Sequence, residues 1–306
     1  MSSTALLTAS RSLNEKQSSN QNFRNRGRKN GPFFNTRDFN DLDELFKAVE
    51  KSIDSLHDHS MAAVWSRIPQ LLAPLQSQRH RHSVTEEQEV MLLIRAVLVH
   101  TLVFMETMQP KELTTIILSM AKIVKIVRQA YQKRRTNIYL RAFGDFLLID
   151  STYARGIIFD RSAEAANRIL KEFDARYLSN LAYSYALLDY NPQLENGSTL
   201  LGNIADASIA CIHEFKPQEI SILVWSYARL SEHHPKLFEK VGVVILEQDS
   251  LDSFEPQNLS NLVWAYATAN IHHPGLFKKV GDAIVDLDSL EHNRFRFYYR
   301  RRNERG

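Results

Sequence analysis

Apolar residues recur at spacings of three and four along most of this chain, a pattern that predicts a succession of amphipathic helices. The first runs cover about 38–56, 60–72 and 84–107. In the second half the runs form pairs, and in the last pair Pro256 and Pro274 each stand where a helix is expected to begin. Proline suits the first helical turn, where its missing N–H has no partner in any case. The pattern therefore predicts an all-α protein built from helical hairpins.

These hairpins are copies of one another. Residues 254–267 read FEPQNLSNLVWAYA and residues 215–228 read FKPQEISILVWSYA, 39 residues apart, and the agreement continues through HHPGLF and HHPKLF. Weaker copies start at 173 and 108, and a degenerate one starts at about 55, where Trp65 takes the place of Trp264. A lone hairpin leaves an apolar face open, and a neighbouring copy covers it. The repeats thus predict an α-solenoid of stacked helical hairpins of about 39 residues each.

Charge and composition divide the chain into four segments. Residues 1–37 carry seven Lys/Arg against one Glu and few large apolar residues, so we expect a disordered basic tail or an organellar transit peptide. Residues 38–172 are predicted to be degenerate repeats with a basic hairpin, and residues 173–290 regular repeats. Residues 291–306 are interpreted as a basic tail at a truncated end.

The formal net charge of +3 conceals a sharp partition. Residues 173–290 sum to −8, from seven Lys/Arg against fifteen Asp/Glu, whereas residues 91–172 sum to +6, from thirteen against seven. A polyanionic partner would be attracted to the middle and the tails rather than to all repeats equally.

Residues 122–141 contain seven basic residues and no acidic one. Two interpretations are open: a solvated helix face and turn, or a phosphate contact site, because uncompensated cations repel one another unless a polyanion lies near. The seven are Lys122, Lys125, Arg128, Lys133, Arg134, Arg135 and Arg141.

The first helix of each repeat has two distinct sides. At 100° per residue, Leu259, Leu262, Val263 and Tyr266 share one side and are predicted to be core. The opposite side is predicted to form an exposed stripe that varies between copies, as a one-site-per-repeat reader of a polymer requires. Its positions are Gln257, Asn261, Ala265 and Thr268, then Gln218, Ile222, Ser226 and Arg229, then Arg176, Asn180, Ser184 and Leu187, and finally Lys111, Thr115, Ser119 and Lys122.

Three aromatic residues, Tyr183, Trp225 and Trp264, lie at the edge of this stripe. They either stack on nucleobases or wedge between neighbouring repeats. Large aromatics that recur at helical spacing are usually core, which favours packing between neighbouring repeats over stacking on nucleobases.

Enzyme and metal signatures are missing. The sequence contains no GxxxxGK[ST], GxSxG or HExxH motif and no convincing acid pair, so the protein is predicted to be non-catalytic, without cofactor or small-molecule substrate. The pairs His233-His234 and His272-His273 lack further ligands at zinc spacing, so no metal is predicted. No run of about 18 apolar residues occurs, so no membrane span is predicted.

The residues FxPQxLSNLVWAYA followed by HHPxLFxxVG resemble the helical repeats of octotricopeptide and FAST-kinase-like proteins, which often end in a RAP domain. The resemblance covers about 55–290. It implies a right-handed superhelix that binds RNA in mitochondria, or alternatively plastids, and acts in processing, stability or translation of organelle transcripts. No RAP domain follows the repeats, so the resemblance implies no catalytic role here.

The expected function is therefore binding of single-stranded RNA, in company with other proteins of a ribonucleoprotein complex. The alternative is a protein-interaction scaffold that uses the acidic solenoid surface. The residues predicted to bind RNA are Lys111, Lys122, Lys125, Arg128, Lys133, Arg134, Arg135, Arg176, Asn180, Arg229, Asn261 and Thr268.

Overall fold

The computed structural model describes residues 35–77, 83–148 and 154–285, and every regular element in these ranges is a helix. The all-α prediction is confirmed. The α-helices are α2 (Leu42–Ser52), α3 (Asp58–Leu72), α4 (Val84–Phe104), α5 (Pro110–Gln132), α6 (Ile138–Leu147), α7 (Asp160–Arg168), α8 (Ala175–Leu188), α9 (Leu200–Ala210), α10 (Pro217–Arg229), α11 (Pro235–Glu247) and α12 (Pro256–Thr268). Residues 274–285 are also helical. Short helical turns are η2 (Thr36–Asp38), η3 (Ile53–Ser55), η4 (Ala73–Ser77), η5 (Met105–Thr107), η6 (Ala154–Phe159), η7 (Leu170–Glu172) and η8 (Ile212–Glu214).

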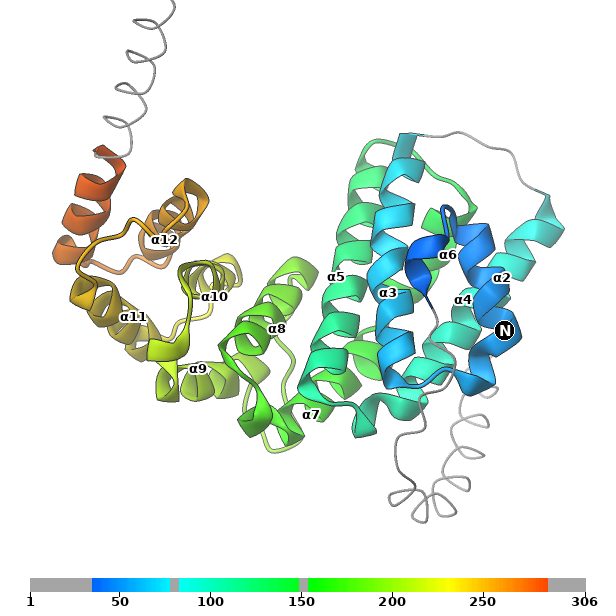
Figure 1. Cartoon of the computed structure of the whole chain (residues 1–306), viewed down its shortest axis with the longest axis horizontal. Coiled ribbons are helices and arrows are strands. Elements are labelled where there is room, and N and C mark those ends of the chain that lie inside the picture. Colours follow the sequence, from blue (N-terminus) through cyan, green and yellow to red (C-terminus); the bar gives the residue numbers. More distant parts are fainter. Residues whose placement is uncertain (1–34, 78–82, 149–153, 286–306) are drawn as a thin grey trace, which may run out of the picture.

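The helices form two layers that follow the repeats. Helices α3, α5, α8, α10 and α12 contact one another consecutively, and α7, α9 and α11 do the same in a second row. In Figure 1, α8, α10 and α12 lie along the inner side of an arc, with α7, α9 and α11 along its outer side. Each of the five motif copies opens an inner helix, including the degenerate copy at 55. These contacts support a helical-repeat fold, whereas the solenoid geometry and the handedness of the superhelix stay predictions.

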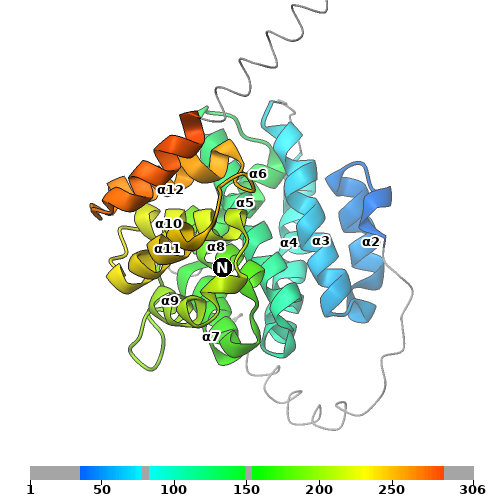
Figure 2. The same ribbon diagram turned by 60° about the vertical axis from the view of Figure 1, so that its left-hand side comes forward.

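The irregular spacing of the early copies has a structural explanation. Between α5 and α8 the chain forms two helices, α6 and α7, where the later repeats have one, and α5 itself is 23 residues long. At the N-terminal end, α2, α3 and α4 pack side by side (Figure 2). The longer spacings are therefore absorbed by extra and lengthened helices. The proposed division at residue 172 stays a prediction, and the expectations for the two tails lie almost wholly outside the described residues.

Four of the five inner helices begin at a residue suited to that place. Proline stands at the first position of α5, α10 and α12, and the Asp174 carboxylate caps α8 by accepting from the N–H of Tyr177 at 2.8 Å. The outer helix α4 has a capping box, in which Ser83 and Glu86 bond to each other's backbone N–H groups. Such caps satisfy N–H groups that have no partner inside the helix.

Four inner helices end in the same left-handed turn, and none uses glycine. One or two positions after the helix end, a residue has φ between 52° and 59°, and the next N–H donates to a carbonyl five residues back, which is the Schellman arrangement. The left-handed residues are Arg134, Asp189, Ser231 and Asn270, and the bonds run from Arg135 to Ala130, Tyr190 to Tyr185, Glu232 to Tyr227 and Ile271 to Tyr266.

A buried tyrosine in each regular repeat ties the two layers together. The hydroxyl groups of Tyr185, Tyr227 and Tyr266 donate to backbone carbonyls of the preceding outer segment, which belong to Phe159, Leu201 and Phe238, at 2.8, 2.5 and 2.6 Å. All three rings are fully buried, and this burial raises the pKa of their hydroxyls. Of the rest of the predicted core side, Leu259, Leu262 and their equivalents are buried, whereas Val263 is half-buried and packs against the core.

Helix α4 and the turn after it, Val84–Thr107, are long and apolar enough to cross a membrane by length and composition, since an 18-residue window within them has a mean hydropathy of 1.8. It packs against α2, α3 and α6. A core helix of a soluble protein passes the same test, so this one helix is weak evidence, and the expectation of no membrane span stays a prediction.

Candidate nucleic-acid interface

The predicted stripe on the inner helices is only partly correct. Its first position is exposed in all four copies, and its second is half-buried. Its third position is buried in every copy, at Ser119, Ser184, Ser226 and Ala265. The prediction that these four are exposed is wrong because they lie at the stripe's edge, where the preceding inner helix packs. Their small side chains let the two helices approach closely.

The aromatic column belongs to the exposed face instead. Tyr183 and Trp225 are half-buried, and Trp264 is 41% exposed. The rings contact one another across the repeats, with centroids 5.6 Å apart for Tyr183 and Trp225 and 5.9 Å for Trp225 and Trp264. They therefore pack between neighbouring repeats, as favoured, and at the same time line the inner surface. Trp65 of the degenerate copy differs, since it is buried and donates to Thr101 at 2.8 Å.

The corrected inner face carries positive charge only. We define this face by four positions in each of the inner helices α5, α8, α10 and α12. They are the stripe's first, second and fourth positions and the position of the aromatic column, which Leu118 occupies in α5. None of these sixteen residues is Asp or Glu, whereas Lys111, Lys122, Arg176 and Arg229 are basic. The charge of −8 over residues 173–290 thus lies on other surfaces of the repeats, which removes the main electrostatic objection to a polyanion on this face.

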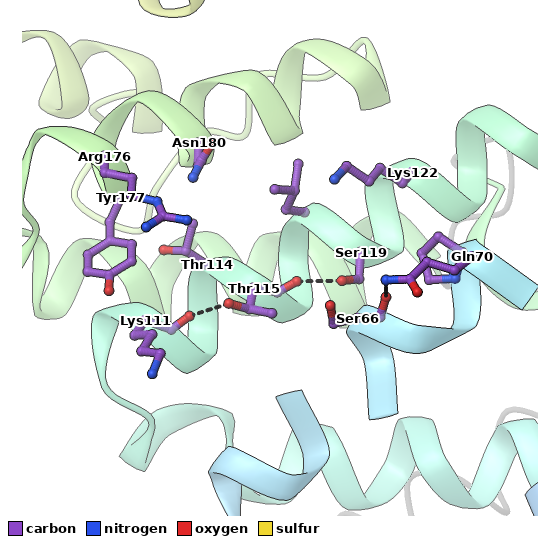
Figure 3. Close-up of a pocket in the computed structure, with 12 residues that line it drawn as sticks. Ser66, Gln70, Lys111, Thr114, Thr115, Ser119, Lys122, Arg176, Tyr177 and Asn180 are labelled. Carbon is purple, nitrogen blue, oxygen red and sulfur yellow. Dashed lines mark hydrogen bonds between the residues drawn. The ribbon is translucent and has the colours of Figure 1, made fainter. Parts of the chain in front are cut away.

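A groove of about 260 Å³ crosses this face where α3, α5 and α8 meet. Figure 3 shows Arg176 and Asn180 from α8 on one side, and the side chains of α5 along the middle. No carboxylate lines the groove. Its lining residues are Ser66, Pro69, Gln70, Lys111, Thr114, Thr115, Leu118, Ser119, Lys122, Arg176, Tyr177 and Asn180. The structure therefore brings together four predicted contact residues, Lys111, Lys122, Arg176 and Asn180.

The groove combines free donors with an unpartnered hydroxyl. Among the described residues, no hydrogen bond or ion pair is recorded for the side chains of Lys111, Lys122 or Arg176. The Thr114 hydroxyl, which is buried at the groove wall, has no hydrogen-bond partner there either. Thr115 and Ser119 donate to carbonyls of their own helix, each at 2.7 Å, so their hydroxyl oxygens keep lone pairs to accept with. The set suits a phosphate and its ribose rather than an apolar ligand.

Ser66, Gln70 and Thr114 were missed by sequence reasoning. Ser66 and Gln70 belong to α3, whose copy of the motif is too degenerate to place its exposed positions. Thr114 lies outside the stripe, one residue before Thr115. Ser66 stands one residue after Trp65, as Ser119 stands one after Leu118, and this register was the one signal that could have found it.

Two of the seven cations in the basic segment 122–141 have partners within the protein. Arg128 donates to the carbonyls of Leu187 and Leu188 at 3.3 and 3.1 Å and so caps the end of α8. Arg141 pairs with Glu87. These two have structural partners, and RNA contact by Arg128 stays a prediction. Within the described ranges the other five, Lys122, Lys125, Lys133, Arg134 and Arg135, are exposed and have no recorded ion pair.

The remaining predicted contacts do not join the groove. Arg229 pairs with Asp189 at 3.2 Å and so bridges α10 to the end of α8. The Asn261 amide oxygen accepts from Gln257 at 3.1 Å, and Thr268 is exposed at the end of α12. Arg229, Asn261 and Thr268 lie farther along the same inner face.

The second histidine of each pair acts as a helix cap. His234 Nδ1 accepts from the N–H of Leu237 at 3.3 Å, and His273 Nδ1 accepts from that of Leu276 at 3.2 Å. In the part of the chain that the structure describes, no three His, Cys, Asp or Glu side chains are grouped to hold a metal ion. The repeated histidines thus have a structural explanation that needs no metal.

Comparison with protein-family models found no match, and comparison with curated proteins found none of significance.

Proposed function

We propose that this chain binds single-stranded RNA along the inner face of its helical stack, with phosphates held in the groove between α3, α5 and α8. In line with the resemblance of the repeats, it would act on transcripts of mitochondria, or alternatively plastids, in their processing, stability or translation. The observation that carries the proposal is the groove itself, which Lys111, Lys122 and Arg176 line without any carboxylate.

Two further observations support RNA as the ligand. The cations continue along α5 beyond the groove, through Lys125 to the turn at Lys133–Arg135, so a long polyanion would find contacts over the length of this helix. The inner face also varies in chemical character from copy to copy, whereas the positions of its supporting core stay apolar. No nucleophile with an adjacent base lines the groove, so the proposed role is binding.

The test is filter binding of a long single-stranded RNA over a salt series, with Lys111, Lys122 and Arg176 replaced together by Gln. For single strands the logarithm of affinity falls with the logarithm of salt concentration by about 0.7 per neutralised phosphate. Loss of three contacts should therefore reduce the slope by about 2. The matched control replaces three exposed lysines outside the groove, Lys51, Lys171 and Lys236, and should leave the slope nearly unchanged.

A second variant tests how far the RNA extends along α5. It carries Lys133→Gln, Arg134→Asn and Arg135→Gln, with Asn at 134 because that residue has φ 52°, which Asn tolerates. A smaller slope would extend the interface to this turn. If the unmodified chain bound no RNA even at low salt, the proposal would be refuted and the scaffold alternative would remain.

A further inference from the structure

The aromatic row Tyr183, Trp225 and Trp264 continues the groove along the inner face. In the repeat motif its column is that of Leu118, which lines the groove itself. Rows of cations and rows of aromatics therefore share one surface, the cations on α5 and α8 and the aromatic rings on α8, α10 and α12. The aromatic half has few free cations, since Arg229 is paired with Asp189.

The rings differ in how much surface they offer. Tyr183 and Trp225 are half-buried, and Trp225 has a ring on either side, at 5.6 and 5.9 Å. Trp264 contacts Trp225 with an interplanar angle of 32° and is still 41% exposed. Among the exposed large apolar side chains of the described residues, Trp264 is the one aromatic. It offers a platform on which another flat ring can stack.

Resting on the proposed function, we infer that the row is a base-stacking platform, with Trp264 as its principal contact and Trp225 behind it. Stacking is tolerant of sequence because every nucleobase has a π-face. It would supply affinity without phosphate neutralisation on the repeats that lack free cations. The RNA would then be held by phosphates in the groove and by bases on the row.

Intrinsic fluorescence reports this contact directly, because the chain has three tryptophans and the third, Trp65, is fully buried. RNA should quench the emission of Trp225 and Trp264. The variants Trp264→Leu and Trp225→Leu/Trp264→Leu use the residue that the chain itself carries in this column at Leu118. The double variant retains only Trp65 and measures any loss of signal from absorption by the RNA.

We expect Trp264→Leu to weaken binding about fivefold or more and to leave the salt slope unchanged, because stacking releases no counterions. An abasic strand of the same length should bind the unmodified chain more weakly by a similar factor, with no quenching. Melting followed by circular dichroism confirms that the variants are folded.

The outcomes separate the two proposals. RNA binding with a normal salt slope, but with no quenching beyond that of the double variant and equal affinity for the abasic strand, would overturn the stacking platform and leave the groove intact. Absence of RNA binding at low salt would overturn both.

Discussion

Gly242 and Gly281 occupy equivalent positions in successive outer helices, yet the structure predicts opposite effects when each is replaced by alanine. A Cβ on Gly242 would lie 2.4 Å from Nε2 and 2.6 Å from Cδ2 of His273. A Cβ on Gly281 would meet no atom of the described residues within 4 Å. Both glycines are inside helices, where alanine is favoured by about 1 kcal/mol. Gly281→Ala should therefore stabilise the chain by about that amount.

His273 cannot simply turn away from the new methyl group at position 242. Its Nδ1 caps the last helix by accepting from the N–H of Leu276, and its ring packs edge-on against Tyr266, with centroids 6.0 Å apart. Overpacking of this kind costs about 1–3 kcal/mol. After the gain in helix propensity, Gly242→Ala should destabilise the last hairpin by up to about 2 kcal/mol.

The assay is hydrogen exchange of residues 256–285, together with denaturant unfolding, because repeats at an array end open locally. Exchange there should be faster in Gly242→Ala and slower in Gly281→Ala. The background His273→Ser keeps an N-cap oxygen and removes the ring, so in it Gly242→Ala should become stabilising. Equal or greater protection in Gly242→Ala than in Gly281→Ala, with His273 present, would refute the steric argument.

Two further predictions concern the core and the pH dependence of stability. Tyr227→Phe removes the hydrogen bond to the Leu201 carbonyl and should lower the free energy of unfolding, measured with denaturant, by about 1 kcal/mol. The control is Tyr183→Phe, which should lower it much less, because the Tyr183 hydroxyl has no hydrogen-bond partner in the described ranges. Burial first, and then the charge of Glu112, raise the pKa of the Asp58 carboxyl above its usual 3.8, so its ionisation favours the unfolded chain. Asp58→Asn should therefore stabilise the protein at neutral pH, and the gain should shrink as pH falls through the raised pKa toward 3.8; a gain independent of pH would contradict this account.

The sequence by itself determined the repeat unit, because its signals are local and periodic. The apolar spacing, the prolines at helix starts and the recurrence of the motif placed all five inner helices and the buried side that contains Leu259 and Leu262. The same periodicity explains why the degenerate copy at 55 was found, since core positions keep their spacing even when their identities drift.

The sequence could not resolve what depends on neighbours. A helical wheel shows angles but not which flank packs against the preceding helix, so Ser226 and Ala265 were misplaced and Trp264 was left at the edge. The left-handed helix ends at Asp189 and Ser231 carry no glycine signal, and the Arg128 bonds to the end of α8 join residues about 60 positions apart.

Tertiary structure therefore decided the candidate site. It separated the cations with structural partners, Arg128, Arg141 and Arg229, from those that line the groove. It also showed that none of the sixteen inner-face positions is Asp or Glu, and that Asp189 meets this face as the partner of Arg229. Total charge is a property of composition, but attraction of a polyanion depends on which surface the charges share, and only the packing of helix against helix creates that surface.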